Sequence, residues 1–493
     1  MKLSKLIFIL FAGITSWAAD ALPSTMVWEV EAGGSAGNGG GFDSASSGTD
    51  RSRQALPQIA INNAAITCTT TGANSNTLTF TGGYTPSAAD VGNVVQFISG
   101  TNINPGFGKI TAQTSSTWTI LMESGNLTTT TGAGSAIVAN MGGAFASPQT
   151  ALSRMQVGGM TTWLAYSTTP YSISTGLTTP SGPSYGTKTR LVGYNTVRGD
   201  IAIGGLARPI VKTTAAVVAM TLTASGYSVE NIEFDGNSTG TQGMVVSAGY
   251  DNQFYNCRAH GFTAEGAQEG GTGGCGFISC EIDHCAGSSY AVKIANGGIL
   301  YSSVHDNTKS GVGGSGSGVR VIGNLIFNNT GASTDGVTVD GLAWTIQHND
   351  IYNNGRHGIY LGTYDIKIDV SNNIMTGNGQ SSGTGYGLKT NATTARFDVG
   401  FHHNAYFNNK TGATSGNTVA GLGDVTLTAD PYTSAGTDFT LNNAAGAGAV
   451  LRGTGGFATP GGLGVNYIDI GALQHQDSGG GVISGGTRAY SIQ

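Results

Sequence analysis

The sequence predicts an all-β fold in which short strands wind into a solenoid of stacked coils. Three observations carry this prediction: a motif that recurs along the chain, a second set of short alternating segments between its copies, and a composition rich in glycine and poor in charge. Self-similarity at a fixed period is the sequence signature of repeat architectures. We therefore expect strands stacked coil upon coil along one axis.

The repeated motif contains an Asn, an apolar residue two positions later, and then Asn or Gly. Its clearest copies are GNLIFNN from Gly323, HNDIYNN from His348, NNIMTGN from Asn372 and HNAYFNN from His403. Upstream, SCEIDHC from Ser279 and SSVHDN from Ser302 fit the same frame with the Asn replaced. The key positions are Cys257, Cys280, Ser302, Asn324, Asn349, Asn373 and Asn404, which lie 22 to 31 residues apart. Each step is one predicted coil, and the last contains an insertion.

A second strand is predicted in each coil, where apolar and polar residues alternate between glycine-rich corners. These segments are GMVVS from Gly243, AVKIA from Ala291, GVTVD from Gly336, GIYLG from Gly358 and GLKTN from Gly387. Alternation places one set of side chains inside and the other outside. Because stacked strands lie about 4.8 Å apart, an inward Asn can hydrogen-bond to the Asn above and below it. The Asn column is therefore predicted to be structural.

Composition agrees with this fold and argues against helical domains. Charged residues make up 10% of the chain, and 81 of its 493 residues are glycine. Gly and Asn tolerate the left-handed conformation that tight turns require. The net charge is −6 and no cluster of Lys and Arg stands out, which argues against nucleic acid as a partner.

From Thr221 to about Gly412 the repeat resembles the right-handed parallel β-helix repeat proteins of the pectin-lyase-like superfamily. Two later segments, ADPYTSAGTDFTLNN and YIDIGALQ, look like the closing segment of that family, whereas GAGAVLRGTGG departs from its pattern. The resemblance implies an all-β, right-handed parallel β-helix solenoid.

The N-terminal part is predicted to differ from the coils. Ala64 to Asn140 are rich in Thr, lack the repeat and resemble the small all-β module that interrupts the N-terminal end of similar proteins. ASPQTALSRM then predicts a short helix with Ser147 as N-cap and Pro148 in the first turn. Such a helix would cover the open end of the solenoid, where backbone groups otherwise lack partners.

The first residues predict export. Lys2 and Lys5 precede an apolar run from Leu6 to Ile14, and Ser16 and Ala18 are small residues where signal peptidase cleaves. The apolar run is far shorter than the roughly 20 residues of a membrane-spanning helix. We therefore expect a secreted protein, extracellular or at the cell surface, without a membrane span.

The cysteines do not form a disulfide scaffold, because five are too few for a chain of this length. Cys257 and Cys280 are expected to point inward in neighbouring coils, where they either form a disulfide or pack without one. Cys275 and Cys285 are expected in turns.

One candidate chemistry is polysaccharide hydrolysis. STDGV from Ser333, RHGIYLG from Arg356 and YGLKT from Tyr386 resemble the signatures of polygalacturonase-type hydrolases. Those enzymes need two adjacent aspartates on an intervening coil, one as general acid and one to activate water. Here Asp335 and His357 are only one coil apart with no aspartate pair between them, and Lys389 lacks the accompanying Arg. The sequence therefore argues against this activity.

A second candidate is a local column of charged residues. Three positions after the key residue lie His260, Asp283 and His305 in successive coils, and one position after it lie Arg258 and Glu281. A stacked His, Asp and His set suits a shared proton, a cation, or a base with the group that orients it. The alternative is a set of surface ladder pairs that contribute a fraction of a kcal/mol.

Lyases of the resembled fold neutralise a uronate carboxylate with a cation or an Arg, and a base removes the neighbouring proton. We therefore predict a protein that binds an extracellular, acidic polysaccharide and either only holds it or also cleaves it as a lyase. The alternative is a non-catalytic structural or adhesive surface protein of tail-spike-like build. The predicted catalytic residues are His260, Asp283, His305 and Lys293. The predicted substrate-binding residues are Arg258, Glu281, Phe327, Tyr352, His357 and Tyr360.

Two further expectations concern the ends of this column. Phe327 and Tyr352 either form a sugar-stacking platform or pack under a loop. Asp283 and Asp306 are the predicted ligands of a divalent cation such as calcium, and no other cofactor is expected.

These elements divide the chain into seven predicted parts. They are a signal peptide (1–18), an opening segment (19–63), the small all-β module (64–140), a cap helix with the first coils (141–220), the repeat core (221–425), closing coils (426–475) and a flexible Gly-rich tail (476–493).

Overall fold

The structure is a computed structural model, and it describes residues 22–63, 66–72, 75–129, 133–181, 187–200, 207–271, 273–287, 289–331, 333–362, 367–391, 399–416, 421–456 and 469–473. The predicted signal peptide and the Gly-rich tail lie outside the described residues. Within these ranges no helix is long and apolar enough to cross a membrane.

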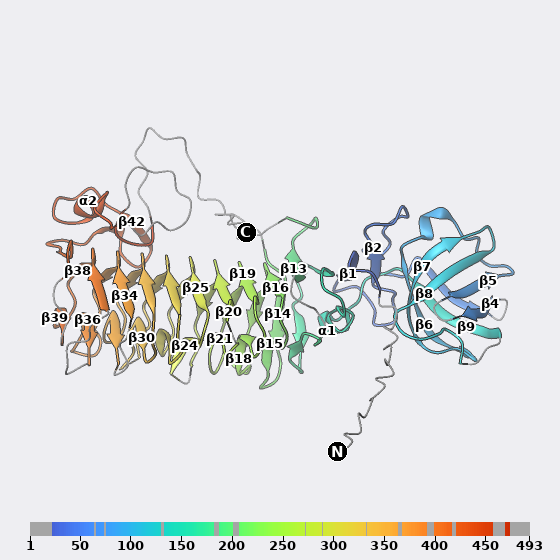
Figure 1. The fold of residues 1–493 in the computed structure, drawn as a ribbon, viewed down its shortest axis with the longest axis horizontal. Helices are drawn as coiled ribbons and strands as arrows, with labels where there is room; N and C mark the ends of the chain where they lie inside the picture. The colour runs from blue at the N-terminus through green and yellow to red at the C-terminus, as the bar shows by residue number, and fades with distance from the viewer. Residues whose placement is uncertain are drawn as a thin grey trace, which may run out of the picture.

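Three long sheets run along the molecule and enclose its main core (Figure 1). One has twelve strands: β2 (Gly41–Asp43), β1 (Met26–Val30), β10 (Thr161–Ala165), β13 (Thr189–Tyr194), β16 (Tyr227–Glu230), β19 (Gln253–Tyr255), β22 (Gly276–Ile278), β25 (Gly298–Leu300), β28 (Arg320–Ile322), β31 (Thr345–Gln347), β34 (Ile368–Ser371) and β37 (Val399–His402). Apart from β2, its strands pair in parallel.

The second sheet has eleven strands and carries the repeated motif. They are β11 (Tyr171–Ile173), β14 (Ile210–Thr213), β17 (Glu233–Asp235), β20 (Arg258–His260), β23 (Glu281–Asp283), β26 (Ser303–His305), β29 (Leu325–Phe327), β32 (Asp350–Tyr352), β35 (Ile374–Thr376), β38 (Ala405–Phe407) and β40 (Val425–Thr426). The middle residue of each central strand points inward, as Ile282, Val304 and Ile326 do, whereas its neighbours point outward.

The third sheet has ten strands and contains all the predicted second strands. They are β12 (Leu177–Thr178), β15 (Val218–Leu222), β18 (Gln242–Val246), β21 (Ala267–Glu269), β24 (Tyr290–Ile294), β27 (Ser310–Gly314), β30 (Val337–Val339), β33 (Ile359–Leu361), β36 (Tyr386–Thr390) and β39 (Gly412–Ser415). The chain visits the three sheets in turn, so that each coil gives one parallel strand to each. The predicted all-β solenoid is therefore confirmed.

The Asn column is buried and hydrogen-bonded from coil to coil, as predicted. Asn324 Nδ2 donates to Asn349 Oδ1, and Asn349 Nδ2 donates to Asn373 Oδ1, each at 2.9 Å. A second column runs at the opposite end of the same strands, through Asn307, Asn329, Asn354, Asn378 and Asn409. The residue before each key position adopts a left-handed conformation, for example His348 with φ 54°. Both columns therefore satisfy the backbone at a repeated turn.

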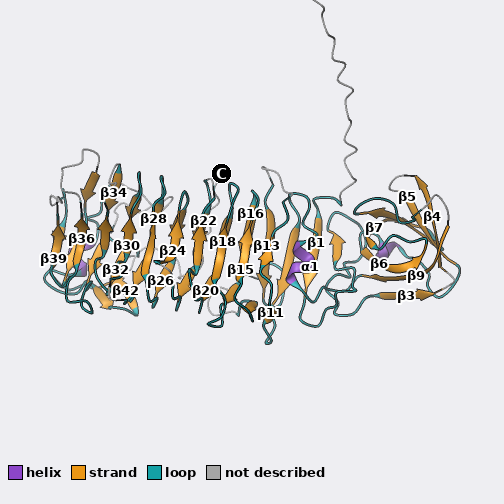
Figure 2. Ribbon diagram, turned by 90° about the horizontal axis from the view of Figure 1, so that it is seen from below, coloured by secondary structure: helices purple, strands orange, loops and turns teal. Residues whose placement is uncertain are grey.

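The N-terminal module is a seven-stranded antiparallel sheet at one end of the solenoid (Figure 2). Its strands are β3 (Ile59–Asn63), β9 (Ala133–Met141), β4 (Ile66–Gly72), β5 (Ser75–Phe80), β8 (Thr117–Met122), β7 (Gly106–Gln113) and β6 (Val94–Thr101), with the short helix η1 (Ala88–Asp90). It has a core of its own around Trp118 and Phe97. The small all-β module is thus confirmed.

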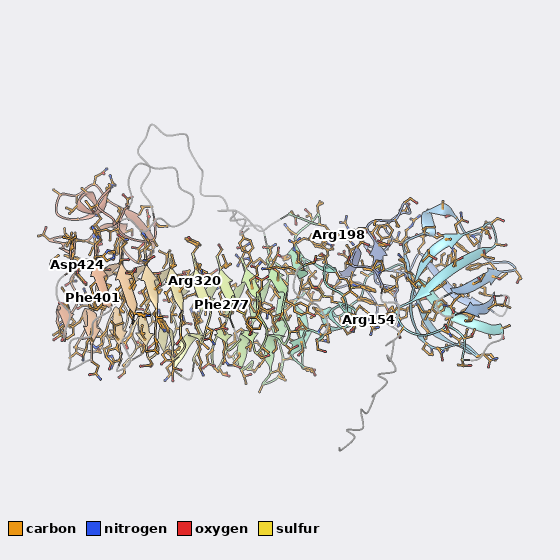
Figure 3. All side chains as sticks on the ribbon, in the orientation of Figure 1. Arg154, Arg198, Phe277, Arg320, Phe401 and Asp424 are labelled. Atoms are coloured by element: carbon orange, nitrogen blue, oxygen red, sulfur yellow. The ribbon has the colours of Figure 1, made fainter. Side chains whose placement is uncertain are left out.

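The helix α1 (Pro148–Leu152) begins after Ser147 and has Pro148 at its start, as predicted. Its buried residues join the main core beside β1 and β10. Arg154 then binds Glu123 of the module and lies 4.6 Å from the centre of the Phe107 ring. Figure 3 shows Arg154 where the solenoid meets the module.

The C-terminal segment covers part of the outer face of the eleven-stranded sheet (Figure 1). It consists of a hairpin, β41 (Tyr432–Ser434) and β42 (Asp438–Leu441), the short helix α2 (Gly448–Leu451) and residues 469–473. Its apolar side chains pack on Phe327, Tyr352, Ile374 and Ala405 to form a third core. The five cysteines are all free and buried, so Cys257 and Cys280 pack without a bond.

Candidate functional site

The predicted charged column exists in the register that the sequence indicates. On the outer face of the eleven-stranded sheet, strand pairing aligns Asp235, His260, Asp283, His305, Phe327 and Tyr352 in one row. A parallel row contains Glu233, Arg258, Glu281, Ser303, Leu325 and Asp350. We call the part of these rows on β17, β20, β23 and β26, together with Asp306, the charged column.

Asp283 lies at the centre of the charged column but is only 1% exposed. Arg258 binds both of its carboxylate oxygens, with Nε–Oδ1 2.9 Å and Nη2–Oδ2 2.8 Å. His284 Nδ1 lies 2.6 Å from Oδ2. Burial opposes ionisation of Asp283, yet these hydrogen bonds hold its pKa below its usual value. Asp283 is therefore an ionised anchor for Arg258 rather than an exposed base.

His260 lies on the same strand as Arg258, β20, and pairs with Glu233 of the preceding coil. Its Nε2 is 3.0 Å from Glu233 Oε1, and this hydrogen bond raises the pKa of His260 above its usual value. In the same row, Lys212 lies 3.4 Å from Asp235. These residues form ion pairs between adjacent coils, the geometry expected of ladder pairs.

His305 differs from the other members of the column because each of its ring nitrogens faces a carboxylate, one at a shorter distance than the other. Nδ1 lies 2.8 Å from Asp306 Oδ2, whereas Nε2 lies 3.5 Å from Glu281 Oε1. Burial would lower the pKa of His305, but Glu281 and Asp306 together raise it. The His305 hydrogen bond in turn lowers the pKa of Glu281. Asp306 therefore orients the ring, and Nε2 is the more loosely held nitrogen.

The aromatic residues of the row lie under the C-terminal hairpin. His305 stacks on Phe327, with ring centres 4.7 Å apart and planes 10° apart. Phe327 and Tyr352 both contact Phe439 of the hairpin, at 5.0 Å and 5.9 Å between ring centres. Of the two expectations for these residues, packing under a covering segment is the one observed. His305 therefore lies at the edge of that cover.

Calcium does not fit this set of ligands. Glu281, Asp283 and His305 offer atoms that lie within 4.8 Å of one another, whereas Asp306 contacts only the far nitrogen of His305. Calcium prefers six to eight oxygen ligands. Both oxygens of Asp283 already accept from Arg258, and a guanidinium at this distance would repel a cation. We therefore derive no step through a metal here.

The structure separates Lys293, Tyr360 and His357 from the charged column. Lys293 and Tyr360 lie in one outward row of the ten-stranded sheet, and His357 lies in the loop before β33. Register arithmetic on the motif could not reveal this, because Lys293 belongs to a different strand family. His357 is adjacent to Arg356, which binds both oxygens of the buried Asp335 at 2.9 Å and 2.7 Å.

The charged column also has a buried neighbour that the sequence did not single out. Asp350 aligns with Glu281 in the outer row but lies under the C-terminal segment, and burial raises its pKa to about 7. Tyr432 and the backbone N–H of Ala472 donate to its two oxygens. The sequence signal that could have found Asp350 is its position between the apolar residues Leu325 and Ile374 of the same row.

Comparisons with known proteins give matches of two kinds. A family model described as a right-handed β-helix region matches residues 265–427. Among solved structures, the chain is similar to the periplasmic alginate epimerase AlgG (15% identity, 55% of this chain and 78% of that one, TM-score 0.31). It is also similar to the pectate lyase Pel9A (13% identity, 65% and 89%, TM-score 0.38).

A third similar structure is the enzymatically active domain of tailspike protein 2 from bacteriophage CBA120 (12% identity, 67% and 53%, TM-score 0.41). No curated protein matches the sequence at a significant level. The family match falls on the coils whose strands build the three parallel sheets. The solenoid of this chain is a right-handed parallel β-helix.

Proposed function

We propose that this protein binds an extended acidic polysaccharide along its solenoid and cleaves it by β-elimination at the charged column. The observation that carries the proposal is the His305 site. One ring nitrogen of His305 is held by Asp306, and the other lies at a loose 3.5 Å from Glu281, at the edge of the hairpin cover. A base needs this arrangement of one fixed and one available nitrogen.

An extended polymer suits the solenoid because outward positions repeat coil by coil. Successive strands of the sheet lie about 4.8 Å apart, so a chain of sugars that runs along the axis meets equivalent positions repeatedly. The charged column spans four adjacent strands in a protein with only 10% charged residues. The C-terminal hairpin covers Phe327, next to His305, so a polymer bound along the charged column would end at the hairpin.

The reaction needs a base beside the acidic carbon of a uronate. His305 Nε2 takes the proton from the carbon next to the carboxylate, and the electron pair left behind forms a carbon–carbon double bond. The glycosidic carbon–oxygen bond on the adjacent carbon breaks, the leaving oxygen takes a proton from water, and the hydroxide that remains takes the proton from His305. Arg258, which Asp283 holds in place, supplies positive charge near the carboxylate. The product is an unsaturated uronate.

A second function is favoured by a specific observation. Arg258, His260 and Asp283 already have partners of opposite charge within the column. Such ion-pair ladders stabilise coil stacking without any ligand. A non-catalytic structural or adhesive surface protein of tail-spike-like build would need nothing more.

We expect His305→Gln to abolish the formation of unsaturated products while the protein stays folded, with a thermal midpoint lowered only by the lost contacts with Phe327 and Asp306. The purified protein is incubated with a panel of uronic-acid and neutral polysaccharides, and absorbance of unsaturated ends and reducing ends are followed. His402→Gln is the matched control, because His402 lies 3.7 Å from Asp369 on the twelve-stranded sheet, away from the column. Asp283→Asn is unsuitable, since loss of one partner of a buried ion pair costs about 3 to 5 kcal/mol.

The pH dependence gives an independent reading of the base. His305 must be neutral to accept the proton, so activity rises with pH through its raised pKa. Asp306→Asn removes one of the carboxylates that raise this pKa, so the rising limb should move to lower pH. If every polymer is bound but none yields unsaturated or reducing ends, the adhesive function is the correct one. An unchanged rate for His305→Gln would remove His305 as the base.

A further inference from the structure

The outward face of the ten-stranded sheet carries a second row of residues that the charged column does not use. Strand pairing aligns Lys293, Gly313, Thr338, Tyr360 and Lys389 on consecutive strands from β24 to β36. Four strand spacings of about 4.8 Å separate the two lysines by about 19 Å. We call this row, together with Tyr290, the lysine–tyrosine row.

Tyr290 adds an aromatic ring at the position of Gly313. A Cβ atom on Gly313 would lie 2.3 Å from Cδ1 of the Tyr290 ring, so the ring lies directly against the glycine backbone. Its hydroxyl donates to Asp340 Oδ2 at 2.9 Å, which fixes the ring across the neighbouring coils. The row therefore contains two tyrosine rings, of Tyr290 and Tyr360, between two terminal lysines.

The ring of Tyr360 is held by two neighbouring side chains, Arg356 and His357. The Arg356 guanidinium lies 5.0 Å from the centre of its ring, and Asp335 holds that guanidinium with two hydrogen bonds. His357 stacks on the same ring at 5.8 Å. These contacts hold the half-buried Tyr360 ring in place, and a rigid aromatic ring is a surface on which the C–H faces of sugar rings pack.

The lysines are the unusual feature of the row. In the described part of the chain, the side-chain amines of Lys293 and Lys389 have no hydrogen bond or ion pair, whereas the charged column contains five carboxylates: Glu233, Asp235, Glu281, Asp283 and Asp306. Lysine without a carboxylate partner is free to pair with an anionic ligand. The lysine–tyrosine row therefore offers a polyanion two positive charges that no carboxylate of the described residues neutralises.

Within the ranges that the structure describes, His357 leaves a buried donor without a partner next to Tyr360. It is 2% exposed, and its Nδ1 accepts the backbone N–H of Tyr386 at 3.1 Å. The ring hydrogen must therefore lie on Nε2, which is buried and has no acceptor among the described residues. Buried donors of this kind are rare in folded proteins. Because His357 stacks on Tyr360, this donor lies beside the row.

We propose that the lysine–tyrosine row is a separate binding site for a stretch of an acidic polysaccharide, with sugar rings on Tyr290 and Tyr360 and carboxylates at Lys293 and Lys389. The site lies on a different sheet from His305 and performs no chemistry. It would keep a long polymer attached while the charged column acts on another stretch. The proposal does not depend on cleavage at His305.

The test measures binding of polygalacturonate and alginate by calorimetry in the His305→Gln background, so that no polymer is cleaved. Lys293→Gln together with Lys389→Gln should weaken binding about tenfold, since two exposed ion pairs each contribute up to about 1 kcal/mol. The loss should shrink at high salt, because exposed ion pairs are screened. Lys367→Gln is the matched control, since Lys367 is an exposed lysine before β34 on the twelve-stranded sheet.

Tyr360→Leu gives a readout that charge does not affect. It should weaken binding of the same polymers at high salt, where the lysine contribution is screened. Binding by the double lysine variant equal to that of Lys367→Gln would overturn the proposal. If His305 is active and the lysine variants bind normally, only this site is wrong. If no unsaturated product forms but the lysine variants lose binding, the lyase function fails and this site stands.

Discussion

Asn349→Leu is expected to lower the free energy of unfolding by about 3 to 5 kcal/mol. Asn349 is completely buried, and its side-chain amide makes four hydrogen bonds. Its Oδ1 accepts the backbone N–H and Nδ2–H of Asn324, and its Nδ2 donates to Val321 O and Asn373 Oδ1. Leucine would leave these groups without partners, and each such buried group costs about 1 to 3 kcal/mol.

Thermal and denaturant unfolding followed by circular dichroism measure this effect. Asn391→Leu is the control, because Asn391 is exposed after β36 and its side chain is not part of either Asn column. The control should change stability by less than about 0.5 kcal/mol. A variant Asn349→Leu with the same midpoint as Asn391→Leu would mean that the column does not stabilise the coils.

The fold was largely predictable because copies of the motif recur once in each coil. The Asn column, the two strand families and the cap helix follow from residue spacing and turn chemistry. The strands of the twelve-stranded sheet, for example β22 and β28, escaped prediction because no residue recurs in them as the Asn recurs in the motif, although the motif strands are equally short. The second Asn column was likewise visible only as the final residue of each motif.

The candidate site was predictable in register but not in environment. Spacing alone aligned His260, Asp283 and His305, because equivalent coil positions stack. Burial of Asp283 depends on how far Arg258 reaches across one coil, and the cover over Phe327 depends on a hairpin more than 100 residues away in the chain. Neither property is local, so spacing could not indicate either.

Raising the pH from 4 to 8 is expected to weaken the attachment of the C-terminal segment to the solenoid. Asp350 of the solenoid binds the C-terminal segment directly. Its Oδ1 accepts a hydrogen bond from the Tyr432 hydroxyl at 3.1 Å, and its Oδ2 accepts one from the Ala472 N–H at 3.2 Å. Burial outweighs these hydrogen bonds and raises the pKa of Asp350 from 3.8 to about 7. Asp430 and Thr376 also act on Tyr432 at this interface.

The sign of the effect follows from the direction of the shift. A pKa that is higher in the docked state means that docking favours the protonated carboxyl, so its contribution is complete below about pH 4 and is lost as the pH rises through about 7. The difference between a pKa of 3.8 and one of about 7 corresponds to about 4 kcal/mol. Hydrogen exchange of the hairpin amides between pH 4 and 8, corrected for intrinsic exchange, measures this loss as reduced protection.

Asp350→Asn separates this effect from other titrations. The histidines of the charged column, whose pKa values are also raised, lose stabilisation in the same direction above about pH 6.5, but they are unchanged in this variant. Asparagine does not titrate, so hairpin protection should become nearly independent of pH between 4 and 6.5. Equal pH dependence in the two proteins would show that Asp350 does not control the attachment. Because Phe439 of this hairpin packs on Phe327, which stacks on His305, its release would also uncover the proposed base.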